Sequence, residues 1–210
     1  MTLPGRDQRV SWVISSTSKE EVEKRYDSWA EEYDADLQAY GYQSPALVAG
    51  LVGRYVPRGA APFLDAGAGT GNMGQALARL GYGDLTAIDL SAGMLSVAQR
   101  TGAYAQVRQM ALGEHLDFPS DHFAAMVCLG TFVGGHAPPE SFAELLRVTR
   151  PEGYMIFTVR NDVVMRFREI MDAHEKAGEW RLIEVTEPYA SVPGSDEPDG
   201  TNQVFVYQVQ

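Results

Sequence analysis

Short apolar runs alternate with amphipathic stretches along most of the chain, and this alternation predicts the fold. The runs that read as strands are residues 63–64, 85–90, 104–110, 123–129, 154–159, 181–185 and 204–209. The stretches with helical periodicity between them are residues 72–80, 91–100, 139–148 and 163–176. Strands that alternate with helices of about ten residues predict an α/β fold, a mostly parallel seven-stranded sheet with helices on both faces. The last two strands have no helix between them, so we expect an antiparallel hairpin at one edge, with the last strand antiparallel.

The region before this alternating part predicts helices of a different kind. Residues 1–17 have no clear periodicity, and we expect them to be irregular. Ser18 and Glu21 have the spacing of a capping box at the start of a helix. The apolar side chains after this cap recur on one helical face, at Val22, Tyr26, Trp29 and Tyr33. An aromatic stripe of this kind predicts a helix that packs on the core and also serves as a lid over a ligand.

Length and charge limit the classes of protein that the chain can represent. Its 210 residues suit one domain, residues 1–210, made of an N-terminal extension with the lid helix (1–43) and an α/β core (44–210). The formal net charge is −11, which disfavours nucleic acid and anionic membranes as partners. The mixed charges at residues 19–25 read as a solvated helix face. We expect a monomer or a homodimer.

Cysteine usage and hydropathy favour a cytoplasmic protein. The single cysteine, Cys128, lies in the apolar run 123–129 and reads as a buried structural thiol, so no disulfide can form within the chain. The first residues contain no apolar stretch typical of a signal peptide. No uncharged apolar stretch approaches the roughly 20 residues needed to cross a bilayer.

The segment F-L-D-A-G-A-G-T-G-N-M-G (63–74) follows a predicted strand and opens a predicted helix. Its glycines fit both G-x-G-x-G and the G-x-G-x-x-G pattern of dinucleotide sites, so the spacing alone leaves two cofactor classes open. Asp65 favours one of them. A carboxylate beside the loop would repel a pyrophosphate, whereas it would attract the sulfonium and ammonium of S-adenosylmethionine. Gly74 then reads as a close-packing residue of the following helix.

Asp89 ends the second predicted strand, 18 residues after Gly71. An acidic residue at this position can accept hydrogen bonds from both hydroxyls of a ribose. Because both cofactor classes contain a ribose, Asp89 predicts nucleoside binding without choosing between them.

Four motifs in order resemble the class I S-adenosylmethionine-dependent methyltransferases: D-A-G-A-G-T-G (65–71), I-D-L-S-A-G-M-L (88–95), L-D-F-P-S-D-H-F (116–123) and E-L-L-R-V-T-R-P-E-G-Y (144–154). The segment L-G-T-F-V-G-G-H-A-P-P-E-S-F (129–142) is most similar to the methyltransferase-like proteins of the Williams–Beuren chromosomal region and their bacterial relatives. Y-D-S-W-A-E-E-Y-D (26–34) resembles the lid helix of that group. The resemblance implies a Rossmann-like fold and S-adenosylmethionine as cofactor.

The resemblance also implies roles for individual residues. Asp65 and the backbone at Gly67 and Gly69 would hold the methionine part of the cofactor, and Asp89 would hold the ribose. The carbonyl of Leu129 would accept from the ammonium. The full set assigned to the cofactor is Asp65, Gly67, Gly69, Gly71, Asp89, Leu90, Met94, Leu112, Gly113, Leu129, Tyr26 and Tyr33.

The adenine end and the lid complete this set. Leu90 and Met94 would sandwich the adenine, while Leu112 and Gly113 would face its amino edge. Many relatives have Asp where this chain has Leu112, so backbone groups or a neighbouring side chain would make that contact. Tyr26 and Tyr33 would close over the cofactor from the lid helix.

Methyl transfer requires alignment of the acceptor, and a general base helps when the nucleophile is a hydroxyl or a protonated amine. His136, in the G-G-H-A-P loop after the fourth strand, is the candidate base because its ordinary pKa of about 6.5 suits proton removal near neutrality. Arg160 and Asn161, at the end of the fifth strand, could contact a polar acceptor. No metal-ligand spacing is evident, and we expect no metal.

The core has no inserted subdomain, so the acceptor pocket must come from the lid, the 130–138 loop and the 188–201 loop. We therefore expect methyl transfer to an oxygen or nitrogen atom of a small molecule. Two alternatives remain open at this point: a protein or RNA methyltransferase, and a nicotinamide-dependent oxidoreductase or non-catalytic binding module.

Overall fold

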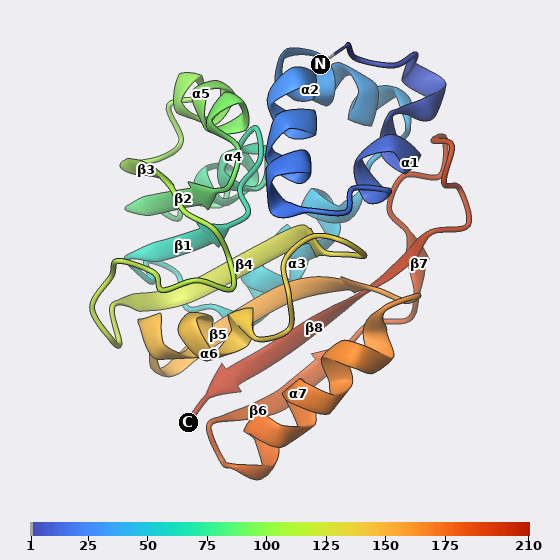
Figure 1. Ribbon diagram of the computed structural model, residues 1–210. Helices are drawn as coiled ribbons and strands as arrows, with labels where there is room; N and C mark the ends of the chain where they lie inside the picture. The colour runs from blue at the N-terminus through green and yellow to red at the C-terminus, as the bar shows by residue number, and fades with distance from the viewer. Residues whose placement is uncertain (1) are drawn as a thin grey trace.

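The computed structural model describes residues 2–210 and shows one sheet with helices on both faces (Figure 1). The strands are β1 (Phe63–Ala66), β2 (Leu85–Asp89), β3 (Gln106–Gln109), β4 (Phe123–Phe132), β5 (Thr149–Arg160), β6 (Trp180–Val185), β7 (Tyr189–Ala190) and β8 (Thr201–Val209). The helices are η1 (Arg6–Gln8), α1 (Arg9–Ile14), α2 (Lys19–Ala39), α3 (Ser44–Tyr55), α4 (Asn72–Arg79), α5 (Ala92–Arg100), α6 (Ser141–Val148) and α7 (Val164–Lys176). The predicted alternation of strands and helices is confirmed.

The strands lie in the order β3-β2-β1-β4-β5-β8-β6, and β7 pairs with β8. The strands from β3 to β5 are parallel, whereas β8 is antiparallel to both β5 and β6. The chain moves outward from β1 to β3 and then returns to place β4 on the other side of β1. Ligands of open α/β sheets bind at such a reversal, beyond the carboxyl ends of the strands.

The expected antiparallel end of the sheet is confirmed, with two differences in detail. The last strand, β8, is inserted between β5 and β6, so β6 forms the edge. The sheet has eight strands where the sequence predicts seven. The additional strand, β7, has two residues within the 188–201 loop, and a segment of that length has no alternation to detect.

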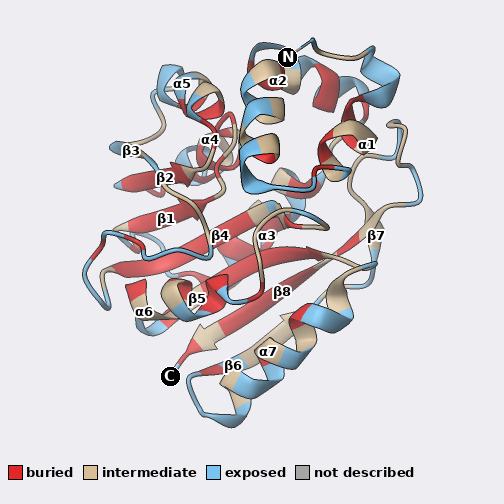
Figure 2. Ribbon diagram, viewed as in Figure 1, coloured by how far each residue is buried: buried red, intermediate tan, exposed pale blue. Residues whose placement is uncertain are grey.

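The central strands are buried on both sides (Figure 2). Leu64 and Ala66 belong to the cluster that includes the apolar faces of α6 and α7. Phe63, on the other side of β1, belongs to the cluster with α3 and α4. Because successive side chains of a strand point to opposite faces, a central strand covered on both faces must be apolar at every position that packs. Cys128 is fully buried in the first cluster, as expected.

The expectation that residues 1–17 are irregular is wrong. They contain η1 and α1, and Val10 and Val13 of α1 pack against Trp29 of α2. The carboxylate of Asp36 joins the two segments: it accepts from Trp29 Nε1 (2.7 Å) and is paired with Arg9. A helix of six residues is too short to show a reliable period, so α1 could not be detected from periodicity.

The start of α2 agrees with the predicted cap, since the Ser18 hydroxyl accepts from the backbone N–H of Glu21 at 3.2 Å. In Figure 1, α2 lies beside α4 and α5, across the carboxyl ends of the central strands. Within residues 2–210, no helix has the length and hydropathy required to cross a bilayer.

Candidate active site

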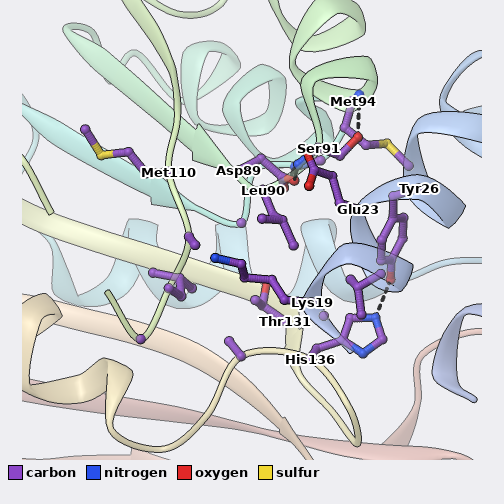
Figure 3. A pocket seen from close by; sticks show the side chains of 18 of the residues that line it. Lys19, Glu23, Tyr26, Asp89, Leu90, Ser91, Met94, Met110, Thr131 and His136 are labelled. Atoms are coloured by element: carbon purple, nitrogen blue, oxygen red, sulfur yellow. Dashed lines mark hydrogen bonds between the residues drawn. The ribbon is translucent and has the colours of Figure 1, made fainter. Parts of the chain in front are cut away.

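A cavity of about 360 Å³ lies where β1, β2 and β4 end, beneath α2 (Figure 3). Four loops and the lid helix contribute its wall. The charged side chains of the lining are one lysine and three carboxylates: Lys19, Glu23, Asp89 and Glu114. Lys19 is paired with Glu114, so the free charge of the cavity is negative. Cations are therefore favoured over phosphates as ligands.

The backbone of the glycine-rich loop forms the floor of the cavity. Gly67 and Gly69 have positive φ angles, 72° and 55°, and both line the cavity. A Cβ atom on Gly67 would lie 2.2 Å from Oγ1 of Thr131, so only glycine fits between the loop and the end of β4. Gly71 lies one step away: it is the N-cap residue of α4 with φ 90° and is not part of the lining.

Asp89 lines the cavity at the end of β2. One carboxylate oxygen accepts from the backbone N–H of Gly69 and the other from that of Ser91, both at 2.8 Å. These bonds fix the plane of the carboxylate and leave each oxygen able to accept again. Burial raises the pKa of Asp89, against the effect of the backbone donors.

Asp65 lies behind the glycine loop and is not part of the cavity lining. It is buried, and it accepts a hydrogen bond from the Tyr104 hydroxyl at 2.6 Å. Burial raises the pKa of this carboxyl to about 7, although the bond from Tyr104 acts in the opposite direction. The predicted contact of Asp65 with the methionine part stays a prediction, and Oδ2 of this carboxylate already accepts from Tyr104.

Tyr104 itself is a site residue that the sequence reasoning missed. Its hydroxyl also accepts from the backbone N–H of Gly74 (3.2 Å), and a Cβ atom on Gly74 would lie 2.2 Å from the tyrosine ring. The close-packing role predicted for Gly74 is confirmed. Gly74 indicated that a neighbour packs closely on α4, but the sequence could not identify that neighbour as Tyr104, which lies 30 residues away.

The residues predicted at the adenine end line the cavity together with Leu129, which is predicted at the ammonium. Leu90, Met94, Leu112, Gly113 and Leu129 come from the ends of β2 and β4, from α5 and from the 110–114 loop. Gly113 has φ 91°, and a Cβ atom there would lie 2.7 Å from Pro138, so this loop packs directly on the loop that carries His136.

The lid contributes the aromatic wall. Tyr26 and Tyr33 both line the cavity, with ring centroids 6.2 Å apart in an edge-on arrangement. Burial raises the pKa of both phenols, so both stay protonated at neutral pH. The Tyr26 hydroxyl reaches the ring of His136, with 3.1 Å between the oxygen and Nε2.

His136 is held in one tautomer by its neighbours. Its Nδ1 lies 2.9 Å from the carbonyl oxygen of Gly134, which can only accept, so Nδ1 carries the hydrogen. Nε2 is then the unprotonated nitrogen and accepts from Tyr26. Burial lowers the pKa of His136, so the ring is neutral at pH 7. The lone pair of Nε2, which accepts from Tyr26, lies at the cavity wall.

Acidic residues of α2 fasten the lid to the core. Asp27 accepts from the Ser91 hydroxyl (2.6 Å) and from the backbone N–H of Gly93 (2.8 Å), which caps α5 from outside. Asp34 accepts from Thr70 (2.5 Å) and Asn72 (2.8 Å) at the start of α4. A carboxylate at a helix N-terminus is favourable, because the free N–H groups and the helix dipole both attract it.

The expectation that residues 19–25 form a solvated helix face is only partly confirmed, because Lys19 and Glu23 line the cavity. Farther along α2, Glu31 forms an ion pair with Arg100 of α5 at 2.8 Å. The signal available in the sequence was the spacing of the acidic residues Glu23, Asp27, Glu31 and Asp34, which places them along one side of a helix.

Comparison with known proteins identifies the family. A family model described as a methyltransferase domain matches residues 64–157, which include the glycine loop and Asp89. The human methyltransferase-like protein 27 is 33% identical over 163 residues, which are 74% of this chain and 66% of that protein. The chain belongs to the class I S-adenosylmethionine-dependent methyltransferases.

Other methyltransferases share the fold or part of the sequence. A TehB-like S-adenosylmethionine-dependent methyltransferase from Corynebacterium glutamicum superposes with a TM-score of 0.65 at 20% identity, over 89% of this chain and 99% of that one. The malonyl-[acyl-carrier protein] O-methyltransferase of Serratia marcescens is 36% identical over 98 residues, 46% of this chain and 37% of that protein. These relatives support S-adenosylmethionine as the cofactor.

The methyltransferase cavity fits this cofactor on its own geometry. Gly67 and Gly69 let a ligand approach the backbone, Asp89 offers two oriented oxygens for a ribose, and the free charge of the wall is negative. A sulfonium and an ammonium suit that charge, whereas a pyrophosphate does not. The buried Asp65 lies behind the loop outside the cavity, and with a pKa of about 7 its carboxyl is only partly ionised near neutrality.

Proposed function

We propose that the protein transfers a methyl group from S-adenosylmethionine to an oxygen or nitrogen atom of a small-molecule acceptor. The observation that carries this proposal is the neutral His136, whose unprotonated Nε2 lies at the wall of the cofactor cavity in contact with Tyr26. A base in this position is required to remove a proton from a hydroxyl or an ammonium.

We assign the cofactor contacts as follows. The backbone at Gly67 and Gly69 and the carbonyl of Leu129 hold the methionine part, and Asp89 holds the ribose hydroxyls. Asp65 lies behind the loop with a pKa of about 7, and a cationic end of the cofactor would favour its ionised form. The other contacts are those of the adenine end and the lid: Leu90, Met94, Leu112, Gly113, Tyr26 and Tyr33.

When bound, the cofactor supplies an electrophilic methyl group on a positively charged sulfur. Tyr26 and Tyr33 of the lid exclude water from the reacting atoms, and the loops after β4 orient the acceptor. The proton lost by the acceptor ends on Nε2 of His136, the one ring nitrogen that carries no hydrogen and that is hydrogen-bonded to Tyr26. No acid is needed, because the group that leaves is a neutral thioether. The contribution of the chain is alignment, exclusion of water and removal of one proton.

A small acceptor is supported by the closed lid. Asp27 and Asp34 fasten α2 across the strand ends, so the acceptor has to fit beneath a helix rather than in an open groove. The net charge of −11 also disfavours RNA.

Titration calorimetry with S-adenosylmethionine, S-adenosylhomocysteine and NAD tests the cofactor. We expect the first two to bind and NAD not to bind; binding of NAD alone would overturn the proposal. A screen of small hydroxyl and amine compounds with methyl-labelled cofactor then tests the acceptor. Label transferred only to protein or RNA would show that the acceptor assignment is wrong while the methyltransferase assignment holds.

A further inference from the structure

A second cavity, of about 90 Å³, lies next to the cofactor cavity. Tyr26, Tyr33 and Gly130 line both cavities, so these three residues form the wall between them. The rest of the second cavity is built by α1, by the far half of α2, by the end of β5 and by the 191–202 segment. Tyr26 of this shared wall is also the residue whose hydroxyl contacts His136.

Most of the lining is hydrocarbon. The apolar and aromatic residues around the second cavity are Val10, Val13, Ile14, Tyr26, Trp29, Tyr33, Leu37, Tyr42, Val133 and Val192. An apolar cavity of about 150 Å³ holds benzene, so a volume of 90 Å³ suits a group of about four carbon atoms. The size and the lining both favour a short aliphatic group over an aromatic ring.

The only basic side chain in this lining, within residues 2–210, is already neutralised. Arg160 has a side chain only 13% exposed, and it pairs with Glu197 at 2.9 Å and with Asp162 at 3.0 Å. An anionic acceptor would therefore meet Glu197 without a free cation to offset its charge. A carboxylate or phosphate is disfavoured there, because burying an unpaired charge costs several kcal/mol.

Asn202 is a further polar residue of this lining, beside Arg160 and Glu197. It is 7% exposed; its amide nitrogen donates to the Ser191 hydroxyl at 2.9 Å, and its amide oxygen is buried without a partner within residues 2–210. An unpaired amide oxygen is an acceptor, so this end of the cavity favours a neutral donor over an anion.

We infer that this second cavity receives the methyl acceptor, and that the acceptor is an uncharged molecule with a short branched or linear aliphatic group and a donor such as a hydroxyl. The inference rests on the proposed function. The aliphatic group occupies the cavity between α1 and α2, and the reacting atom lies at the shared wall beside Tyr26.

The residues at that wall can then take up the proton that the acceptor loses. A bond forms between the acceptor oxygen and the methyl carbon, the carbon–sulfur bond breaks, and its electron pair remains on sulfur. The acceptor proton passes to the oxygen of Tyr26 while the Tyr26 proton passes to Nε2 of His136. Tyr26 is therefore a relay in contact with the acceptor, and His136 is the final base.

Ligand-observed NMR on the protein saturated with S-adenosylhomocysteine tests the charge and size preference. Isobutanol and isobutyrate are the probes, since they have the same carbon skeleton and differ in charge. We expect millimolar binding of isobutanol and at least tenfold weaker binding of isobutyrate. Equal binding, or preference for isobutyrate, would overturn the inference.

Two pairs of variants locate the site. Val192→Phe fills the cavity and should abolish isobutanol binding, whereas Met165→Phe, at a site 76% exposed, should not. Glu197→Gln removes one partner of Arg160 and should raise isobutyrate binding at least fivefold. Glu184→Gln is its control, because Glu184 pairs with the exposed Arg54 outside both cavities. Unchanged probe binding in both Val192→Phe and Glu197→Gln would show that isobutanol binds elsewhere.

Calorimetry with S-adenosylhomocysteine on each variant separates the two possible failures. Retained affinity shows that the variant is folded and that its cofactor cavity is intact. If the unsubstituted protein fails to bind this compound, the proposed function fails. If it binds the compound but not isobutanol, only the acceptor inference fails.

Discussion

Nε2 of His136 and the hydroxyl of Tyr26 lie 3.1 Å apart, in a hydrogen bond that joins the loop after β4 to the lid helix. The bond exists only when α2 is docked, because Tyr26 is carried by that helix. A base assembled in this way is complete only under a closed lid. Proton removal and exclusion of water are thereby coupled to one conformation.

Replacement of His136 by alanine should lower kcat by about 10²–10⁴-fold, the usual contribution of a general base. Affinity for S-adenosylhomocysteine should change less than twofold. Because burial lowers the pKa of His136, the base is neutral at pH 7, and activity of the unsubstituted protein should fall only as the pH drops through that lowered pKa. Alanine at this position should remove that acidic limb; an unchanged kcat would show that His136 is not the base.

Asp89→Ala should weaken binding of S-adenosylhomocysteine by about 1–3 kcal/mol, roughly 5- to 150-fold, because the ribose hydroxyls and the backbone donors of Gly69 and Ser91 lose their acceptor. Calorimetry measures the change directly. Asp84→Asn, at an exposed position outside the cavity, is the matched control and should bind normally. Equal affinity in both variants would contradict the assigned role.

Gly67→Ala should abolish cofactor binding. The new Cβ would lie 2.2 Å from Oγ1 of Thr131, and the residue has φ 72°, a conformation that side chains disfavour. Adding Thr131→Ala to the same chain removes the nearest atom and should restore part of the affinity. Gly50→Ala, in open space on α3, should leave binding unchanged. The idea fails if Gly67→Ala binds S-adenosylhomocysteine with ordinary affinity.

Asp27→Ala should loosen the lid, since α5 loses the carboxylate that caps its first turn. A cap of this kind contributes about 1 kcal/mol to stability. Limited proteolysis should cleave near α2 faster in this variant than in the unsubstituted protein, and bound S-adenosylhomocysteine should slow that cleavage. Lys24→Ala, at an exposed position of the same helix, should be cleaved at the ordinary rate. Equal rates in both variants would show that Asp27 does not hold the lid.

Lowering the pH should reduce the free energy of unfolding through the protonation of Glu144. The hydrogen bonds from Arg147 hold the pKa of Glu144 at about 2, against the effect of burial. Because the pKa is lower in the folded than in the unfolded protein, Glu144 stabilises the fold above about pH 4.5, and this contribution is lost as the pH falls toward 2. Denaturant unfolding at several pH values should show a smaller loss between pH 5 and 3 in Glu144→Gln than in Glu140→Gln, the exposed control. Parallel curves would refute the assignment.

The sheet could be predicted because its central strands are apolar along their length and its helices carry clear faces. Phe123 to Leu129 and the helix after Ser91 agree closely with the structure. The segment before Ser18 could not be predicted, because α1 has six residues and is held by contacts with Trp29 and Asp36 rather than by its own periodicity.

Part of the cavity lining could also be predicted. Gly67 and Gly69 lie just after β1 and Asp89 ends β2, so their positions in the sequence place them at the carboxyl ends of the strands. Contacts between distant segments could not be found in this way: the bond from Tyr104 to Asp65 and the cap that Asp27 supplies to α5 both depend on how elements pack.

The N-terminal helices α1 and α2 meet the 194–196 segment at the lid, which has a consequence for the order in which the molecule assembles. The Ser11 backbone N–H donates to Asp196 at 3.1 Å, and that of Gly194 donates to the Tyr40 carbonyl at 2.9 Å. During synthesis α1 and α2 leave the ribosome first, yet their partners near residue 195 emerge almost last. Contacts this far apart in sequence form late, because a long loop must close before they can be made. We therefore expect the contacts of α1 and α2 with the 194–196 segment to form after their contacts with each other.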